Sequence, residues 1–107
     1  MPPAALLVLA ILVEVAGTIA LRYTDGFTKL TPSLLAVVSY ATAFYLVALV
    51  LRTMPVSVTY AVWSAVGTAA VAVIGMTMLD EPATVLKIAS LVLIVIGVVG
   101  LNVEGTH

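Results

Sequence analysis

The sequence predicts an all-α membrane protein with four transmembrane helices in each chain. Of its 107 residues 64% are hydrophobic and only 8% are charged, whereas a soluble domain is usually about 25% charged. A water-soluble protein this short would have too little polar surface to cover itself. The few charged residues also separate four long apolar segments, each close to the roughly 20 residues that a helix needs to cross a bilayer.

The predicted spans are residues 4–21, 30–51, 56–79 and 85–103, and together they form a single integral membrane domain, residues 1–107. Gly26 is suited to the left-handed conformation that ends the first helix. In "TPS", Thr31 is expected to cap the second helix, with Pro32 in its first turn. In "DEP", Asp80 or Glu81 is expected near the N-terminus of the fourth helix, followed by Pro82.

Composition excludes several functional classes. The chain has no cysteine, so disulfides and thiol chemistry are excluded. Its net charge is −1 and its basic residues are scattered, so no nucleic-acid partner is expected. Without a nucleophile–base pair or a metal cluster, neither an enzyme nor a bound metal or cofactor is expected. The first segment lacks the basic start of a cleaved signal peptide, which favours a retained span in a multi-pass protein of the bacterial inner membrane.

The basic residues indicate little about orientation. An even number of spans places both termini on one side of the membrane. Arg22, Lys29 and Lys87 then lie on one face and Arg52 on the other. This bias is too small to set a topology by the positive-inside rule, so insertion in both orientations remains open. Lys87 lies one turn inside the fourth span, and its long stem is expected to carry the ammonium back to the interface.

Glu14 is the one acidic or basic residue deep in a predicted span. An acid at the bilayer centre costs about 2.5–3.5 kcal/mol on insertion scales, and such residues usually face a bundle interior or a wet cavity. Removal from water disfavours the charged form, so this carboxyl group is suited to hold a proton or to release it and bind a cation. A protonated Glu14 that merely bonds to a neighbouring helix is the alternative. Its helical neighbours leave room for a ligand or a helix: Leu7, Ala10, Ile11, Gly17 and Thr18.

Aromatic residues repeat at helical spacing in the second and third spans. In "YAVWSAVG" one helix face carries Tyr60, Trp63, Ser64 and Gly67. The second span has Tyr40 and Phe44 one turn apart. Such rings commonly form interfacial belts or pack on lipid. Near a carboxylate, they also suit a lipophilic or quaternary cation through cation–π attraction, and both interpretations remain open.

Small residues mark the fourth span. Ser90 and Gly97 lie two turns apart on one face, where they allow close helix approach. This stripe is a candidate dimer contact, with packing inside the chain as the alternative. Four helices with one acidic residue are too few to surround a solute pathway well. This favours a homo-oligomer in which the subunits share the site.

These residues resemble the small multidrug resistance family over essentially the whole chain. The segments that carry the resemblance are "VEVAGTIALRYTDGF", "TPS", "YAVWSAVG" and "GVVGLN". The resemblance implies an antiparallel homodimer that exports cationic compounds in exchange for protons, with Glu14 of both subunits as the shared proton and cation site. It places Tyr40, Tyr60 and Trp63 at the substrate and Gly67 in a hinge. It implies a pocket lined by Leu7, Ala10, Ile11, Gly17, Thr18, Phe44 and Ser64.

Two departures indicate the branch of the family. Relatives that export guanidinium typically carry Trp at the position of Gly17 and a hydroxyl residue in the second span near the site, where this chain has Ala43. The chain therefore resembles the broad-specificity branch that exports quaternary ammonium compounds. A guanidinium exporter and one half of a heterodimeric pair remain alternatives. Outside the family, a rotor-type proton-translocating subunit also places one carboxylate in a membrane helix, but four spans and the aromatic face disfavour it.

Overall fold

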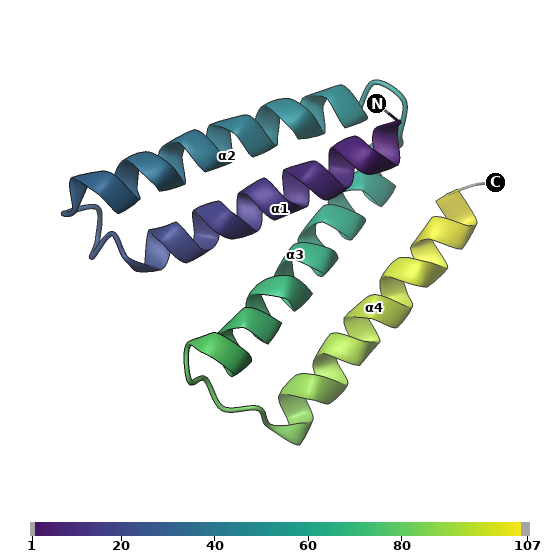
Figure 1. Ribbon diagram of the computed structural model, residues 1–107. Coiled ribbons are helices and arrows are strands. Elements are labelled where there is room, and N and C mark those ends of the chain that lie inside the picture. Colours follow the sequence, from purple (N-terminus) through teal and green to yellow (C-terminus); the bar gives the residue numbers. More distant parts are fainter. Residues whose placement is uncertain (1, 106–107) are drawn as a thin grey trace. The chain divides into compact units, whose positions relative to one another are not determined.

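The computed structural model describes residues 2–105, with side chains through residue 103. Within these residues the chain forms four α-helices: α1 (Pro3–Arg22), α2 (Leu30–Val50), α3 (Val56–Met78) and α4 (Val85–Gly105) (Figure 1). Each is long and apolar enough to span a membrane. The predicted all-α, four-span fold is confirmed, and the predicted ends agree to within two residues.

The first compact unit runs to Met54 and contains α1 and α2, which pack side by side along their lengths (Figure 1). Small residues on α2 allow this close packing, since Ala36 and Ala43 are both fully buried. Helices in a membrane gain little from hydrophobic burial, because lipid is as apolar as leucine. Close van der Waals contact between small residues is therefore the main stabilisation available to this hairpin.

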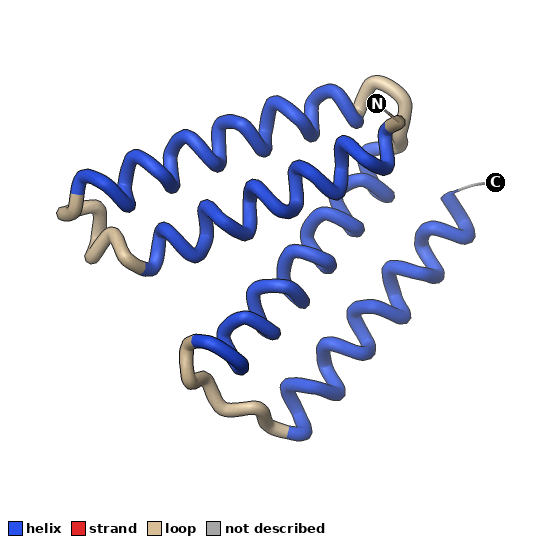
Figure 2. Tube along the Cα trace, in the orientation of Figure 1, coloured by secondary structure: helices blue, strands red, loops and turns tan. Residues whose placement is uncertain are grey.

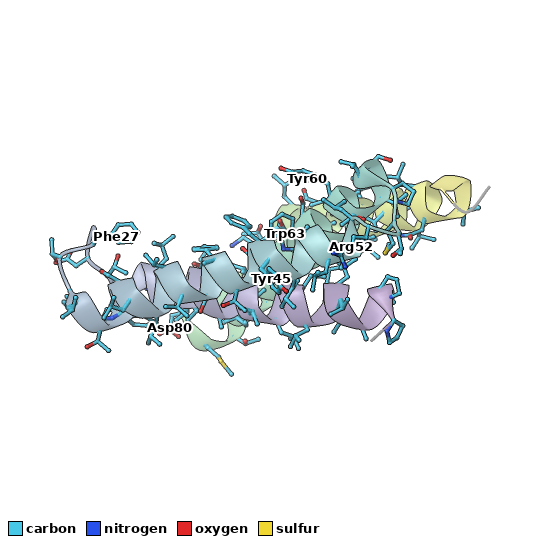
Figure 3. All side chains as sticks on the ribbon, turned by 90° about the horizontal axis from the view of Figure 1, so that it is seen from above. Phe27, Tyr45, Arg52, Tyr60, Trp63 and Asp80 are labelled. Carbon is cyan, nitrogen blue, oxygen red and sulfur yellow. The ribbon has the colours of Figure 1, made fainter. Side chains whose placement is uncertain are left out.

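The loop between α1 and α2 is organised by Thr24, which is only 1% exposed. Its hydroxyl donates to the Leu21 carbonyl at 2.8 Å and accepts from the Phe27 amide at 3.1 Å. Gly26 has φ 69°, which confirms the predicted left-handed conformation. Asp25 and Phe27 share it, with φ 49° and 66°. Figure 2 shows this connection as a compact loop, and Phe27 is labelled on it in Figure 3.

The predicted capping role of Thr31 is wrong. Lys29 occupies the N-cap position of α2, and no side chain bonds to the free amides there. α2 begins at Leu30, so Thr31 lies inside the first turn and not at the N-cap position before it. Pro32 also lies in this turn, as predicted, where its missing N–H does no harm.

The second compact unit begins at Pro55 and contains α3 and α4, which also pack side by side (Figure 1). After α3 the chain turns at Asp80, whose φ is 57°. The amide of Glu81 then donates to the Gly75 carbonyl at 3.0 Å. The same carbonyl also accepts from the Leu79 amide at 3.2 Å, so Gly75 ties the start of the loop to the last turn of α3.

The fourth helix begins at Val85 as predicted, but neither Asp80 nor Glu81 lies in its first turn. α4 begins at Val85, and the hydroxyl of Thr84 accepts from the Lys87 amide at 3.1 Å, as an N-cap does. Asp80 forms the left-handed turn that follows α3, and the Glu81 amide bonds back to Gly75 of α3. Both acidic residues therefore belong to the end of α3 and not to the start of α4. The Lys87 ammonium reaches back and donates to the Pro82 carbonyl at 2.8 Å, in agreement with the predicted return toward the helix start.

Candidate functional site: the acidic residue of the first helix and the aromatic residues

Glu14 lies in the middle of α1 and is half-buried. Arg22, at the end of α1, is the only other acidic or basic residue in α1, α2 and α3. These three helices therefore provide no interior lysine or arginine that could neutralise the carboxylate. Such an isolated acid in an apolar helix needs hydrogen-bond donors, a proton or an external cation.

Two hydroxyl groups connect Glu14 to α2. The Thr18 hydroxyl donates to Glu14 Oε1 at 2.9 Å, one helical turn along α1. The same Thr18 oxygen lies 2.6 Å from the Tyr40 hydroxyl of α2, within hydrogen-bond distance. We call Glu14, Thr18 and Tyr40 the hydroxyl chain. It shows that the acid of α1 faces α2, with its neighbour Thr18 between the two helices.

Gly17 sets the approach of α1 to α2 beside this chain. A Cβ atom at Gly17 would lie 2.9 Å from Ser39 Cβ, a distance that real Cβ atoms do not show. It would also be in ordinary contact with the Ala36 carbonyl oxygen and the Tyr40 amide nitrogen, at 3.6 and 3.7 Å. The structure therefore places Gly17 against the backbone of α2, and its role in a pocket lining stays a prediction.

The other predicted lining residues of α1 are also covered within this chain. Leu7 is 4% exposed, Ala10 is fully buried and Ile11 is 5% exposed. A helix face with small residues was expected to accommodate a ligand or another helix. The structure shows this face buried, and whether a ligand also reaches Leu7, Ala10 or Ile11 stays a prediction.

Aromatic side chains continue the site on α2. Tyr40 is half-buried and Phe44 is exposed, and their rings stack with centroids 6.3 Å apart and planes inclined by 29°. The Tyr40 ring therefore has a polar end in the hydroxyl chain and an apolar face against Phe44. Tyr40 thus joins the hydroxyl chain to the exposed aromatic surface of α2.

A second aromatic pair lies on α3, in the other compact unit. Tyr60 and Trp63 meet edge to face, with centroids 6.2 Å apart and an interplanar angle of 89° (Figure 3). Tyr60 and Ser64 are exposed, whereas Trp63 is half-buried. Gly67 is buried in a helix that continues through it without interruption, so a hinge there stays a prediction.

The small residues of α4 have no neighbours that fill the space beside them. A Cβ atom at Gly97 would meet nothing within 4 Å, and Ser90 is exposed with its hydroxyl bonded to the Leu86 carbonyl of its own helix at 2.7 Å. Neither residue takes part in close packing inside the described part of the chain. Their role in a dimer contact stays a prediction.

Sequence reasoning named Thr18 and Tyr40 but missed their hydrogen bond, and it missed Ser39 entirely. A signal was present, because Ala36, Ser39 and Ala43 form a stripe of small residues on α2 at helical spacing. Such stripes allow close helix approach in membranes. The partner of the stripe, Gly17, was not evident because Gly17 also suited a pocket lining.

Comparison with known proteins identifies the family of this chain. The family model described as Small Multidrug Resistance protein matches residues 4–94. The chain is 46% identical to the multidrug resistance protein mmr of Mycobacterium leprae over 99 residues, covering 92% of each chain. It is 40% identical to the guanidinium exporter of Escherichia coli over 102 residues, covering 95% of this chain and 96% of the exporter. A four-span chain with an isolated first-helix acid and this extent of similarity belongs to the small multidrug resistance family of membrane transporters.

Proposed function

We propose that the protein is a proton-coupled antiporter that exports lipophilic and quaternary ammonium cations across the inner membrane of a bacterium. The observation that carries the proposal is the isolation of Glu14. Its described hydrogen-bond donor is the neutral hydroxyl of Thr18, and α1 to α3 contain no interior basic residue. An ionised Glu14 therefore favours a positive charge from outside the protein, which is either a proton or a cationic substrate.

Competition between these two cations provides the exchange. A carboxyl group that holds a proton has no charge with which to attract a cation, and a carboxylate bound to a cation takes up a proton less readily. Coupling also requires that the two occupancies favour inward-facing and outward-facing arrangements to different extents. The proton gradient then drives export, with no cofactor.

An antiparallel homodimer completes the proposed site, with Glu14 of both subunits sharing the proton and the substrate. The exposure of α4 supports an additional partner, because none of its residues 85–103 is buried within the chain. Lipid or a second subunit must cover these side chains. In two antiparallel copies, the inward-facing and outward-facing arrangements become the same structure with the subunit roles exchanged. The weak bias of the basic residues is compatible with insertion in both orientations.

The aromatic side chains suit a large apolar cation. In the proposed site, Trp63, Tyr60 and Tyr40 surround the apolar body of the substrate while Glu14 binds its charge. The contact at Gly17 supports this preference, because a tryptophan at that position would collide with Ser39 unless the helices moved apart.

Proton release on substrate binding tests the proposed function. Purified protein in weakly buffered detergent solution should release protons when a tetraphenyl cation is added, because the cation displaces protons from Glu14. The wild-type protein would be compared with Glu14→Gln, which should release none. Tight binding of the tetraphenyl cation with no proton release from the wild-type protein would refute the exchange mechanism.

Export of guanidinium is the second candidate function, because the chain is 40% identical to the Escherichia coli guanidinium exporter. The same measurement separates the two candidates. Proton release with guanidinium and none with the tetraphenyl cation would favour the guanidinium exporter. Release with the tetraphenyl cation alone would favour the quaternary ammonium exporter.

Replacement of Trp63 by alanine is expected to weaken binding of aromatic cations by roughly 2- to 30-fold, since a cation–π contact contributes about 0.5–2 kcal/mol. Proton binding should change much less, because the indole carries no titrating group. Isothermal calorimetry with a tetraphenyl cation measures the affinity, and a pH titration of the same variant measures proton binding. Trp63→Phe, which retains an aromatic face, should lose less affinity. Equal affinities in the wild-type protein and Trp63→Ala would exclude Trp63 from the site.

A further inference from the structure

We propose that Thr18 is a positioning residue that transmits the protonation state of Glu14 to Tyr40 on α2. This inference rests on the proposed function, because it gives Glu14 two protonation states. Its geometric basis is the hydroxyl chain, in which one oxygen atom, Thr18 Oγ1, lies 2.9 Å from Glu14 Oε1 and 2.6 Å from the Tyr40 hydroxyl. Thr18 therefore contacts both the acid of α1 and the aromatic residue of α2.

The donor and acceptor roles along the hydroxyl chain follow from the number of protons available. An ionised carboxylate only accepts hydrogen bonds, and a threonine hydroxyl has a single proton to donate. When Glu14 is ionised, Thr18 donates to it and must accept from Tyr40. Both hydroxyl groups then point their hydrogen-bond donors toward the carboxylate, and each bond polarises the next.

Protonation of Glu14 allows the opposite direction. The carboxyl group can now donate to Thr18, whose own proton becomes available to the Tyr40 oxygen. The only covalent bond that forms is the O–H bond of protonated Glu14. The Thr18 and Tyr40 hydroxyls keep their own protons and only change the direction in which these point. The Tyr40 hydroxyl changes from donor to acceptor, so its hydrogen points away from the chain and toward the surroundings of its ring. A substrate near Tyr40 thus meets a different hydroxyl orientation in each state.

The close approach at Gly17 holds this chain together. Gly17 precedes Thr18 on α1, and Ser39 precedes Tyr40 on α2. Because Gly17 packs directly against Ser39, the following residue on each helix is brought within hydrogen-bond distance of its partner. The only titratable groups on α1 and α2 besides Glu14 are Arg22, Tyr40 and Tyr45. Of these three, Tyr40 is the member of the hydroxyl chain.

A set of four variants tests the inference in the full-length protein. Thr18→Val removes the hydroxyl at nearly constant shape, Thr18→Ser retains it, and Tyr40→Phe removes only the tyrosine hydroxyl. Thr42→Val is the matched control, because the Thr42 hydroxyl donates to the Val38 carbonyl of its own helix at 2.8 Å and is exposed. The readout is the affinity for a tetraphenyl cation as a function of pH.

Loss of the Thr18 donor disfavours the ionised carboxylate, so Thr18→Val should move the midpoint of the binding profile to higher pH by about one unit. Thr18→Ser and Thr42→Val should keep the wild-type midpoint. Tyr40→Phe should shift it in the same direction by less. Because Tyr40 acts through Thr18, the double variant Thr18→Val/Tyr40→Phe should have the midpoint of Thr18→Val alone.

The outcomes separate this inference from the proposed function. Proton release from the wild-type protein with an unmoved midpoint in Thr18→Val would reject the transmitting role of Thr18 and leave the antiporter intact. Additive shifts in the double variant would show that Tyr40 reaches Glu14 by another route, which also rejects it. Unchanged proton release from Glu14→Gln would instead reject the proposed function itself.

Discussion

Replacement of Glu14 by glutamine is expected to abolish proton-driven export and to weaken binding of cationic substrates by at least roughly 30-fold. Truncating one member of a desolvated charge pair costs about 2 kcal/mol or more. The variant retains the size and hydrogen-bonding capacity of the side chain, so Thr18 can still donate to its carbonyl oxygen. What disappears is the negative charge and the site that exchanges protons. Uptake of a labelled quaternary cation into proteoliposomes with an imposed pH gradient measures the loss.

Glu14→Asp is the matched control for this experiment. It retains the charge but shortens the side chain, so it should keep some coupled transport with altered pH dependence. Circular dichroism and elution in mild detergent should match the wild-type protein for both variants. Uphill transport by reconstituted Glu14→Gln would show that the coupling site lies elsewhere.

Replacement of Gly17 by valine is expected to destabilise the α1–α2 hairpin by about 1–3 kcal/mol, as overpacking of a close contact does. The new side chain would collide with Ser39, whose Cβ atom is 2.9 Å from an added Cβ at Gly17. Separation of the helices would also break the bond between Thr18 and Tyr40. The expected result is a lower denaturation temperature in detergent together with reduced substrate affinity.

Two controls test whether the contact itself is responsible. Ala16→Val enlarges the adjacent, exposed residue and should change stability by no more than about 0.5 kcal/mol. The second control is the pair Gly17→Ala and Gly17→Ala/Ser39→Gly. Because the second change removes the colliding atom, it should restore part of the stability and affinity lost in Gly17→Ala. If Gly17→Val were as stable as Ala16→Val, the close approach of α1 and α2 would not be a requirement of the fold.

The fold was predictable because its main constraint is local. Backbone amides and carbonyls find no water in the bilayer, so long apolar segments must satisfy them internally as helices. The distribution of apolar and charged residues along the chain therefore determines where α1 to α4 lie, to within two residues. The residues that cap the helices were less predictable. Thr84 caps α4 while Asp80 belongs to the end of α3, because several polar residues compete for the same short loop.

The candidate site was predictable only in part. Glu14 is evident from the sequence, because an acid in an apolar segment has no local reason to be there. The stacking of Tyr40 on Phe44 and the edge-to-face contact of Tyr60 with Trp63 also follow from spacing along one helix. In contrast, the bond between Thr18 and Tyr40 joins residues on different helices. Helical periodicity indicates which residues share a face but not which residue of the next helix lies opposite.

The sequence by itself determined that this protein spans the membrane four times, that it belongs to a family of small transporters, and that its one interior acid is Glu14. These properties depend on composition, on spacing within a segment, and on similarity along the chain. Only the tertiary structure decided that Gly17 fits against Ser39 and that Thr18 bridges Glu14 to Tyr40. The physical reason is that the register between two helices is set by close packing of small side chains, where a single Cβ atom decides whether two hydroxyl groups meet.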